Sequence, residues 1–500
     1  MELPFEKTVC RYWKQKLYTL HNHEQTQELR IPEGMPDVAR VISTWGQVIV
    51  RGKDWMDRNI GIQGGVMVWI LYQPEGDAGL QRLETWIPFR CRIDHSGSDQ
   101  DGVIRVQSLL RNMDARILST RKLMLRCSVG LLVQALVPEQ AEISVPGELP
   151  EDVEVLRNTY PMMLTVETGE KRFELDEELE IPGLISPVKS LVYFQMEPEL
   201  ADQKVLGSKA VFHGIGNLHV LYWNEEERLC CYDFQIPFGQ YLDLEGDYEE
   251  EALIRNLLCV TGLELDVQDD GTLRLRCSFV SQYTVQARSV LDLLEDAYSP
   301  VRDVELTCDT LTIPAVLDTG MYTVDLSARV DGQDATLVDR NYRQDFPEVN
   351  RQGDGVSVMQ TGSFDVLQEE KEGQILLKSG KGSEEMGMKS HCTNDTVAFS
   401  WRKGAVGCRR DGMDWRADTQ MVLDLSCISS QSLTMVTSMK LGAERKPESD
   451  QPGVIIRRKG SHERLWDLAK RCGSTVSAIE RINQLETEPE DDRLLLIPVL

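Results

Sequence analysis

The stretch LRLRCS at residues 273–278 alternates apolar and polar side chains, and the similar stretch LMLRCS stands 150 residues earlier, at 123–128. Alternation with a period of two is typical of a β strand with one buried face. Three more pairs recur in the same order at nearly the same offset: LRIP and LEIP at 29 and 179, ILY and VLY at 70 and 220, and IPF at 87 and 236. The sequence therefore predicts two copies of one β-rich domain, at residues 1–145 and 146–300.

The strand patterns inside each copy favour a mainly β fold. Val66–Tyr72 and Leu218–Trp223 are rich in β-branched and aromatic residues and are bounded by turn formers. Many short strands with Gly, Pro, Asp and Asn between them indicate tandem β-sandwich or barrel-like domains. One short helix is expected at Pro36–Ile42, where Pro and Asp stand in a possible first turn.

The strand patterns continue over residues 301–443, but the repeat fades there, so this stretch is predicted to be a divergent β-rich domain. Within it, residues 365–390 are rich in Glu, Gly, Lys and Ser, which favours a mobile loop or insertion. Residues 444–453 are charged and contain two prolines, a composition that indicates a linker.

The pattern changes at the C-terminal end of the chain. Val454–Arg458 and Leu494–Pro498 predict short strands, while Leu465, Leu468, Ala469 and Cys472 share one helical face. A second helix is expected after Ser474-Thr475, with Gly473 ending the first one. Residues 454–500 are thus predicted to form a small β-α-α-β module.

The charge and cysteine content narrow the possible partners. The formal net charge is −27, which opposes binding to nucleic acid or to anionic lipid surfaces. No apolar run is long enough for a membrane span, and the first residues do not resemble a secretory signal, so we expect a cytosolic, non-secreted protein. The 12 cysteines are scattered and are therefore expected to be reduced thiols.

No catalytic or cofactor site stands out in the sequence. The acidic clusters at 249–251 and 269–270 are better explained as solvated faces or turns. His391-Cys392, Cys408 and Cys427 lie too far apart for the close ligand pairs that structural zinc sites use. We therefore expect no enzyme activity, no cofactor and no metal.

The C-terminal module resembles the LysM family. The resemblance rests on Gly460 and on LWDLAKRCGSTV at 465–476, with Ile479, INQL at 482–485 and LIP at 496–498. In this family two loops form a glycan-binding groove, and here they correspond to 460–464 and 486–492. The first loop is longer than usual and the second is acidic, which favours a protein ligand over N-acetylglucosamine polymers. The expected binding residues are Gly460, Ser461, His462, Leu465, Trp466, Asn483, Gln484 and Leu485.

The body resembles the SPOCS domain of spore-forming Firmicutes. The resemblance rests on IPEGMPDVARVI at 31–42 and on EDAYSP at 295–300. Repeated SPOCS domains followed by LysM are typical of a spore coat morphogenetic protein. This resemblance implies a mother-cell protein at the forespore surface, whose LysM module binds the coat morphogenetic ATPase and supports encasement by other coat proteins. The alternative is a peptidoglycan-binding or cell-wall lytic protein.

Overall fold

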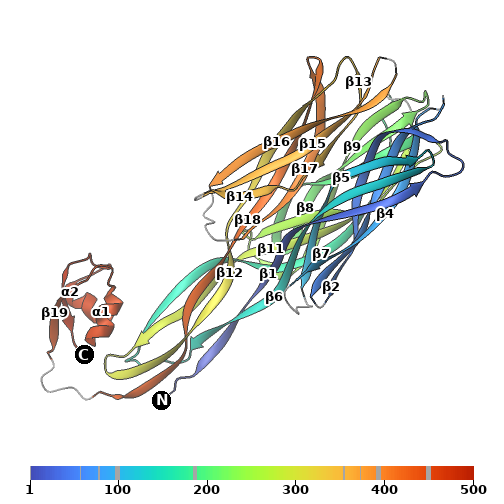
Figure 1. Cartoon of the computed structure of the whole chain (residues 1–500). Helices are drawn as coiled ribbons and strands as arrows, with labels where there is room; N and C mark the ends of the chain where they lie inside the picture. The colour runs from blue at the N-terminus through green and yellow to red at the C-terminus, as the bar shows by residue number, and fades with distance from the viewer. Residues whose placement is uncertain are drawn as a thin grey trace.

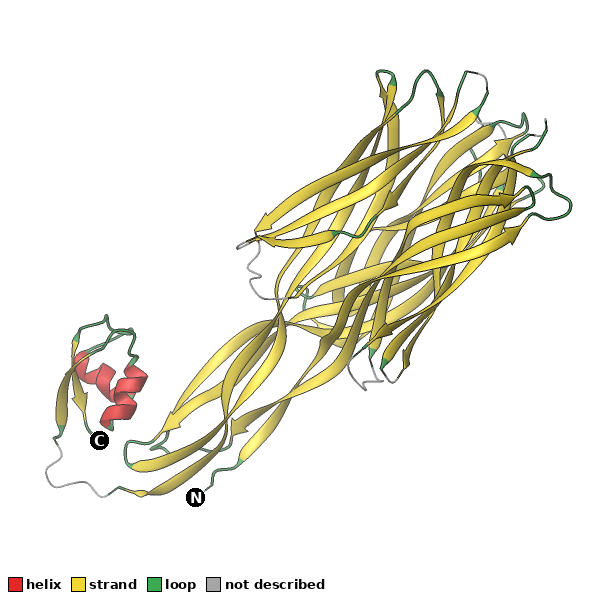
Figure 2. Ribbon diagram, in the orientation of Figure 1, coloured by secondary structure: helices red, strands yellow, loops and turns green. Residues whose placement is uncertain are grey.

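The computed structural model describes residues 2–500 apart from 57, 77–78, 96–101, 184–187, 353–354, 372, 390–395 and 446–451. Strands dominate the described residues, which confirms the mainly β class (Figure 2). The expected linker at 444–453 lies largely outside the described residues.

The first group of strands, which we call unit 1, forms two antiparallel three-stranded sheets. One sheet has the order β1-β6-β5 and the other has the order β2-β3-β4. The strands are β1 Phe5–Arg30, β2 Val38–Met56, β3 Asn59–Pro74, β4 Gln81–Asp94, β5 Val103–Ser119 and β6 Lys122–Pro146. The apolar residues between the two sheets include Ile62, Val68 and Leu125, which are fully buried.

The second group, unit 2, repeats part of this pairing in sheets ordered β7-β11-β10 and β8-β9. Its strands are β7 Glu154–Leu179, β8 Val188–Asn224, β9 Leu229–Tyr248, β10 Leu253–Val267 and β11 Leu273–Tyr298. In the long β8, Gly207 has a φ of 64°, a left-handed conformation that glycine adopts without strain.

The third group, unit 3, has one sheet ordered β12-β18-β17 and a second in which β15 lies between β16 and the pair β13 and β14. The strands are β12 Arg302–Val330, β13 Thr336–Gln344, β14 Glu348–Gln352, β15 Gly355–Glu369, β16 Ile375–Lys389, β17 Thr396–Asp411 and β18 Asp414–Glu444. In all three units the first long strand pairs with the last, and the last pairs with the one before it. The same strand pairing is thus present in unit 3, where the sequence repeat fades. The domain limits expected from the sequence stay predictions.

Two local expectations are wrong. The loop expected at 365–390 is largely the antiparallel pair β15–β16, in which Gly380 and Gly382 lie against β12. A Cβ atom at Gly380 would stand 2.4 Å from the carbonyl oxygen of Arg329, so the glycines permit close packing of strands. The helix expected at Pro36–Ile42 does not form, and β2 begins there at Val38, because β-branched residues favour a strand. The Asp37 carboxylate, just before the strand, accepts a hydrogen bond from Arg121.

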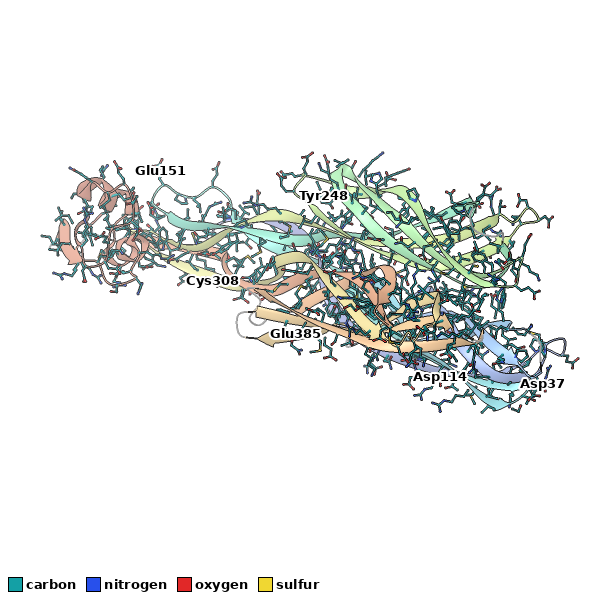
Figure 3. The ribbon with its side chains drawn as sticks, turned by 90° about the horizontal axis from the view of Figure 1, so that it is seen from above. Asp37, Asp114, Glu151, Tyr248, Cys308 and Glu385 are labelled. Atoms are coloured by element: carbon teal, nitrogen blue, oxygen red, sulfur yellow. The ribbon has the colours of Figure 1, made fainter. Side chains whose placement is uncertain are left out.

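The long strands form a stalk below a broad head (Figure 1). The pairs β1–β6, β7–β11 and β12–β18 begin at the narrow end of the stalk, where the N-terminus and the C-terminal module also lie. All three pairs contribute to one apolar core along the stalk, which includes Ile143, Leu293 and Ile313. Seen from above, Asp37 lies at the end of the molecule opposite to the module (Figure 3).

Buried glutamines join unit 1 to the other two units. The side-chain amide of Gln47 donates to the carbonyl of Met196 (2.8 Å), and its oxygen accepts from the Met196 N–H (3.0 Å). Gln282 makes the same two bonds with Val106, both at 2.8 Å. Gln107 makes them with Trp401, at 2.5 and 3.3 Å. Each amide therefore satisfies a backbone N–H and C=O pair, as a neighbouring strand would.

Candidate functional site

The C-terminal module has the element order β19 Val454–Arg458, α1 Leu465–Cys472, α2 Val476–Asn483 and β20 Leu494–Pro498. The Thr475 side chain accepts a hydrogen bond from the Ala478 N–H and so caps α2, while Gly473 ends α1 with a φ of 64°. Leu468 and Ile479 are buried between the helices and the strands. These elements present two neighbouring loops, residues 459–464 and 484–493.

Acidic side chains of the second loop hold the first one in place. Asp491 pairs with the ammonium of Lys459 at 2.9 Å, and this bond lowers the pKa of Asp491. Glu488 accepts a hydrogen bond of 2.8 Å from the N–H of Leu465, at the start of α1. The acidic character of this loop therefore has a structural role, because it satisfies donors that an exposed helix start leaves free.

Glu463 occupies the inside of the first loop. Its carboxylate accepts a hydrogen bond of 3.0 Å from the Gly460 N–H and pairs with Arg471 at 3.0 Å and Arg457 at 3.4 Å. The backbone donor that a ligand would meet at Gly460 is therefore bonded within the chain.

The structure places the expected binding residues in different surroundings. Gly460, Ser461 and His462 share the first loop, and Ser461 and His462 are exposed. Leu465 is a core residue, and Leu485 packs against the same core. Asn483 bonds both backbone groups of Leu496, at 2.6 and 2.9 Å, and Gln484 ends α2 with a φ of 50°.

Trp466 is buried against the body of the protein, with 7% of its surface exposed. Its ring meets the ring of Tyr298 edge-on, 4.8 Å between centroids, and its indole N–H donates to Asp296 at 2.8 Å. Lys470 pairs with the same carboxylate at 2.7 Å, and the Tyr298 hydroxyl donates to the Ser474 carbonyl at 3.0 Å. Trp466 is one of the expected binding residues, and strand β11 covers its ring.

A cavity at the junction of the three units does not offer a free pair of carboxylates. Its volume is about 140 Å³, and its lining includes Glu197 and Asp424. Glu197 pairs with Lys403 at 3.4 Å, and Asp424 pairs with Arg255. Both carboxylates are therefore neutralised by cations, and the volume is below the ~300 Å³ at which small-molecule sites begin.

A partly buried ionic cluster joins units 2 and 3. His219 on β8 lies 2.6 Å from Asp233 on β9 and 2.7 Å from Asp339 on β13, and Asp233 also pairs with Arg340. Burial alone would lower the pKa of His219, but the two carboxylates more than offset this effect and raise the pKa to about 9. His219 is therefore protonated at neutral pH and stabilises the contact between the units.

Within the described part of the chain, no three His, Cys, Asp or Glu side chains are grouped as a metal site requires. His391 and Cys392, which the sequence spaces too far from Cys408 and Cys427 for a zinc site, lie outside the described residues. Cys427 is disulfide-bonded, so the expectation that all cysteines are thiols is wrong at this position. No helix among the described residues is long and apolar enough to cross a membrane.

Comparison with known protein families gives a match for one segment of the chain. Residues 37–118, which include strands β2 to β4 and nearly all of β5, match the family model described as SipL, SPOCS domain. This match indicates a sporulation-related protein. No curated protein and no solved structure matches the chain.

Proposed function

We propose that this chain is a non-enzymatic assembly protein of the spore coat. In this proposal units 1 to 3 are SPOCS-type scaffold domains, and residues 454–500 form a LysM-type module that binds the coat morphogenetic ATPase. The protein acts at the forespore surface, in the mother-cell cytoplasm, and supports encasement by other coat proteins. The match of residues 37–118 to the SPOCS model is the observation that carries the proposal.

The arrangement of the module's loops supports a protein ligand rather than a glycan. Recognition of N-acetylated sugars needs amide donors and a stacking surface, and here Glu463 bonds the Gly460 N–H while Trp466 lies against Tyr298. Groups that are already satisfied within the chain contribute little to a ligand, because binding must first break their present bonds.

Binding of the purified ATPase to the full chain and to a chain ending at residue 445 tests this proposal. We expect the full chain to bind and the shortened chain to lose binding, as measured by biolayer interferometry. Equal binding by both chains would show that the module is not the binding site for the ATPase. Sedimentation of the full chain with peptidoglycan, without affinity for the ATPase, would favour the glycan-binding alternative.

A further inference from the structure

The two-stranded sheet formed by β19 and β20 has an apolar outer face. Ile456 pairs with Leu496, Arg458 with Leu494, and Val454 with Pro498, so these six side chains share one face. Ile456 is 68% exposed, Leu494 62% and Val454 46%. The opposite face holds Leu495 and Ile497, which are buried in the module core. Both faces of this two-stranded sheet are therefore largely apolar, although only one of them is covered.

This outer face is the side of the module that the rest of the chain leaves available. Helix α1 contacts β11 through Trp466 and Lys470, and the two loops bond each other through Lys459 and Asp491. Figure 1 shows β19 on the side of the module away from the stalk. A contiguous exposed apolar patch on a folded module is typical of a protein-binding surface.

Charge and size indicate the kind of partner. Arg458 lies within the face and has no ion pair among the described residues. Its guanidinium group favours carboxylates on the partner. Two strands of five residues form a surface roughly 16 Å long, which is the length of about three turns of helix. The Asn483 amide bonds the outer backbone groups of Leu496, which blocks addition of a strand to β20 there.

We propose that the outer face of the β19–β20 sheet is the surface on which the module binds its protein partner, and that it accepts an amphipathic helix with carboxylates near Arg458. This inference rests on the proposed function, because it names the surface through which the module docks. It assigns partner binding to Ile456 and Leu494 rather than to the loop at Gly460 or to Trp466.

The test measures the affinity of the full chain for the purified coat morphogenetic ATPase by biolayer interferometry. We expect Ile456→Glu and Leu494→Glu each to weaken binding by ~30-fold or more, the loss typical of an interface hot spot. Arg458→Glu is expected to weaken binding in the same direction. Met413→Glu is the matched control, because Met413 is 65% exposed on the hairpin between β17 and β18 and should leave affinity unchanged.

The outcomes separate this inference from the proposed function. If the unchanged protein binds and the Ile456→Glu and Leu494→Glu variants bind equally well, the surface is misassigned although the docking function stands. If the unchanged protein does not bind, the docking function itself fails, and the inference fails with it. Thermal unfolding of each variant checks the fold. New hydrogen-exchange protection of the β19 amides in the complex would show strand addition and overturn the helical partner.

Discussion

Tyr298 and Asp296 decide how the module sits on the body, although both lie far from it in the sequence. Asp296 stands 170 residues before Trp466, so no local pattern could have shown that their side chains meet. The helical spacing predicted Leu465 as a core position, and the structure places it there. Trp466 was harder to interpret, because an aromatic residue at the edge of a helix face can meet either solvent or another domain.

Tyr298→Ala is expected to loosen the module from the stalk. The variant loses the ring contact with Trp466 and the hydrogen bond to the Ser474 carbonyl. We expect faster amide hydrogen exchange in α1, with no change in β8 and β9. Tyr241→Ala is the control, because Tyr241 is 50% exposed on β9 and lies outside the module contact. Unchanged exchange in α1 would show that Tyr298 does not hold the module.

His219 should make the contact between units 2 and 3 sensitive to alkaline pH. Its pKa is raised to about 9 from an ordinary value near 6.5, so its stabilising effect is complete below pH ~6.5 and is lost as pH rises through 9. We expect the free energy of unfolding to fall over this pH window by at most about 3 kcal/mol, which is the free energy that corresponds to a pKa shift of this size. His219→Gln should be less stable near pH 6.5 and should show a flatter profile up to pH 9.

The control for this prediction is His213→Gln, on the same strand but outside the ionic cluster. Its profile is expected to follow that of the unchanged protein. A wild-type stability that stays constant between pH 6.5 and 9.5 would contradict the role of His219.

At the scale of single elements, alternating patterns predicted strands well, while composition was misleading in β16. The segment 375–389 contains Gly380, Gly382 and Gly387, together with Ser, Lys and Glu, which together are also typical of a loop. In the structure Gly380 and Gly382 leave room for the backbone of β12. A sequence does not reveal which glycines serve a close approach between strands, because that depends on a partner strand more than 40 residues away.

Gly380→Ala should therefore destabilise unit 3, whereas Gly387→Ala should not. A Cβ atom at Gly380 would meet the Arg329 carbonyl oxygen at 2.4 Å, and backbone atoms cannot move aside easily. A Cβ atom at Gly387 meets nothing within 4 Å, although both residues lie on β16. We expect urea unfolding to show a loss of ~1–3 kcal/mol for Gly380→Ala and little change for Gly387→Ala. Equal stability of the two variants would contradict the close packing of β16 on β12.

At the scale of the whole molecule, the offset of 150 residues predicts a relation between the first two units but not the third. The short motifs that carry the offset fade after residue 300, yet the pairing of first, last and next-to-last strand persists. Strand pairing depends on backbone hydrogen bonds and on which face is apolar, so it tolerates a change of nearly every side chain. The sequence predicted the β class and the element order of the module, whereas the packing of the units depends on contacts such as the glutamine pairs.

Gln107→Leu tests how much these amide pairs stabilise the assembly of units. The variant leaves the buried N–H and C=O of Trp401 without partners, which should cost about 2–3 kcal/mol. We expect a lower unfolding temperature and faster hydrogen exchange in β5 and β17. Gln73→Leu is the control, because Gln73 is exposed on β3. A variant as stable as the control would show that the amide pair does not hold units 1 and 3 together.

The placement of the N-terminus and of the module at the narrow end of the stalk has a mechanical consequence. The three long strand pairs run from this end toward the head, so tension between a bound module and the head acts along the strand axes (Figure 1). The hydrogen bonds of an antiparallel pair are perpendicular to its strands. A pull along the stalk therefore loads many of these bonds together in shear, instead of opening them one after another.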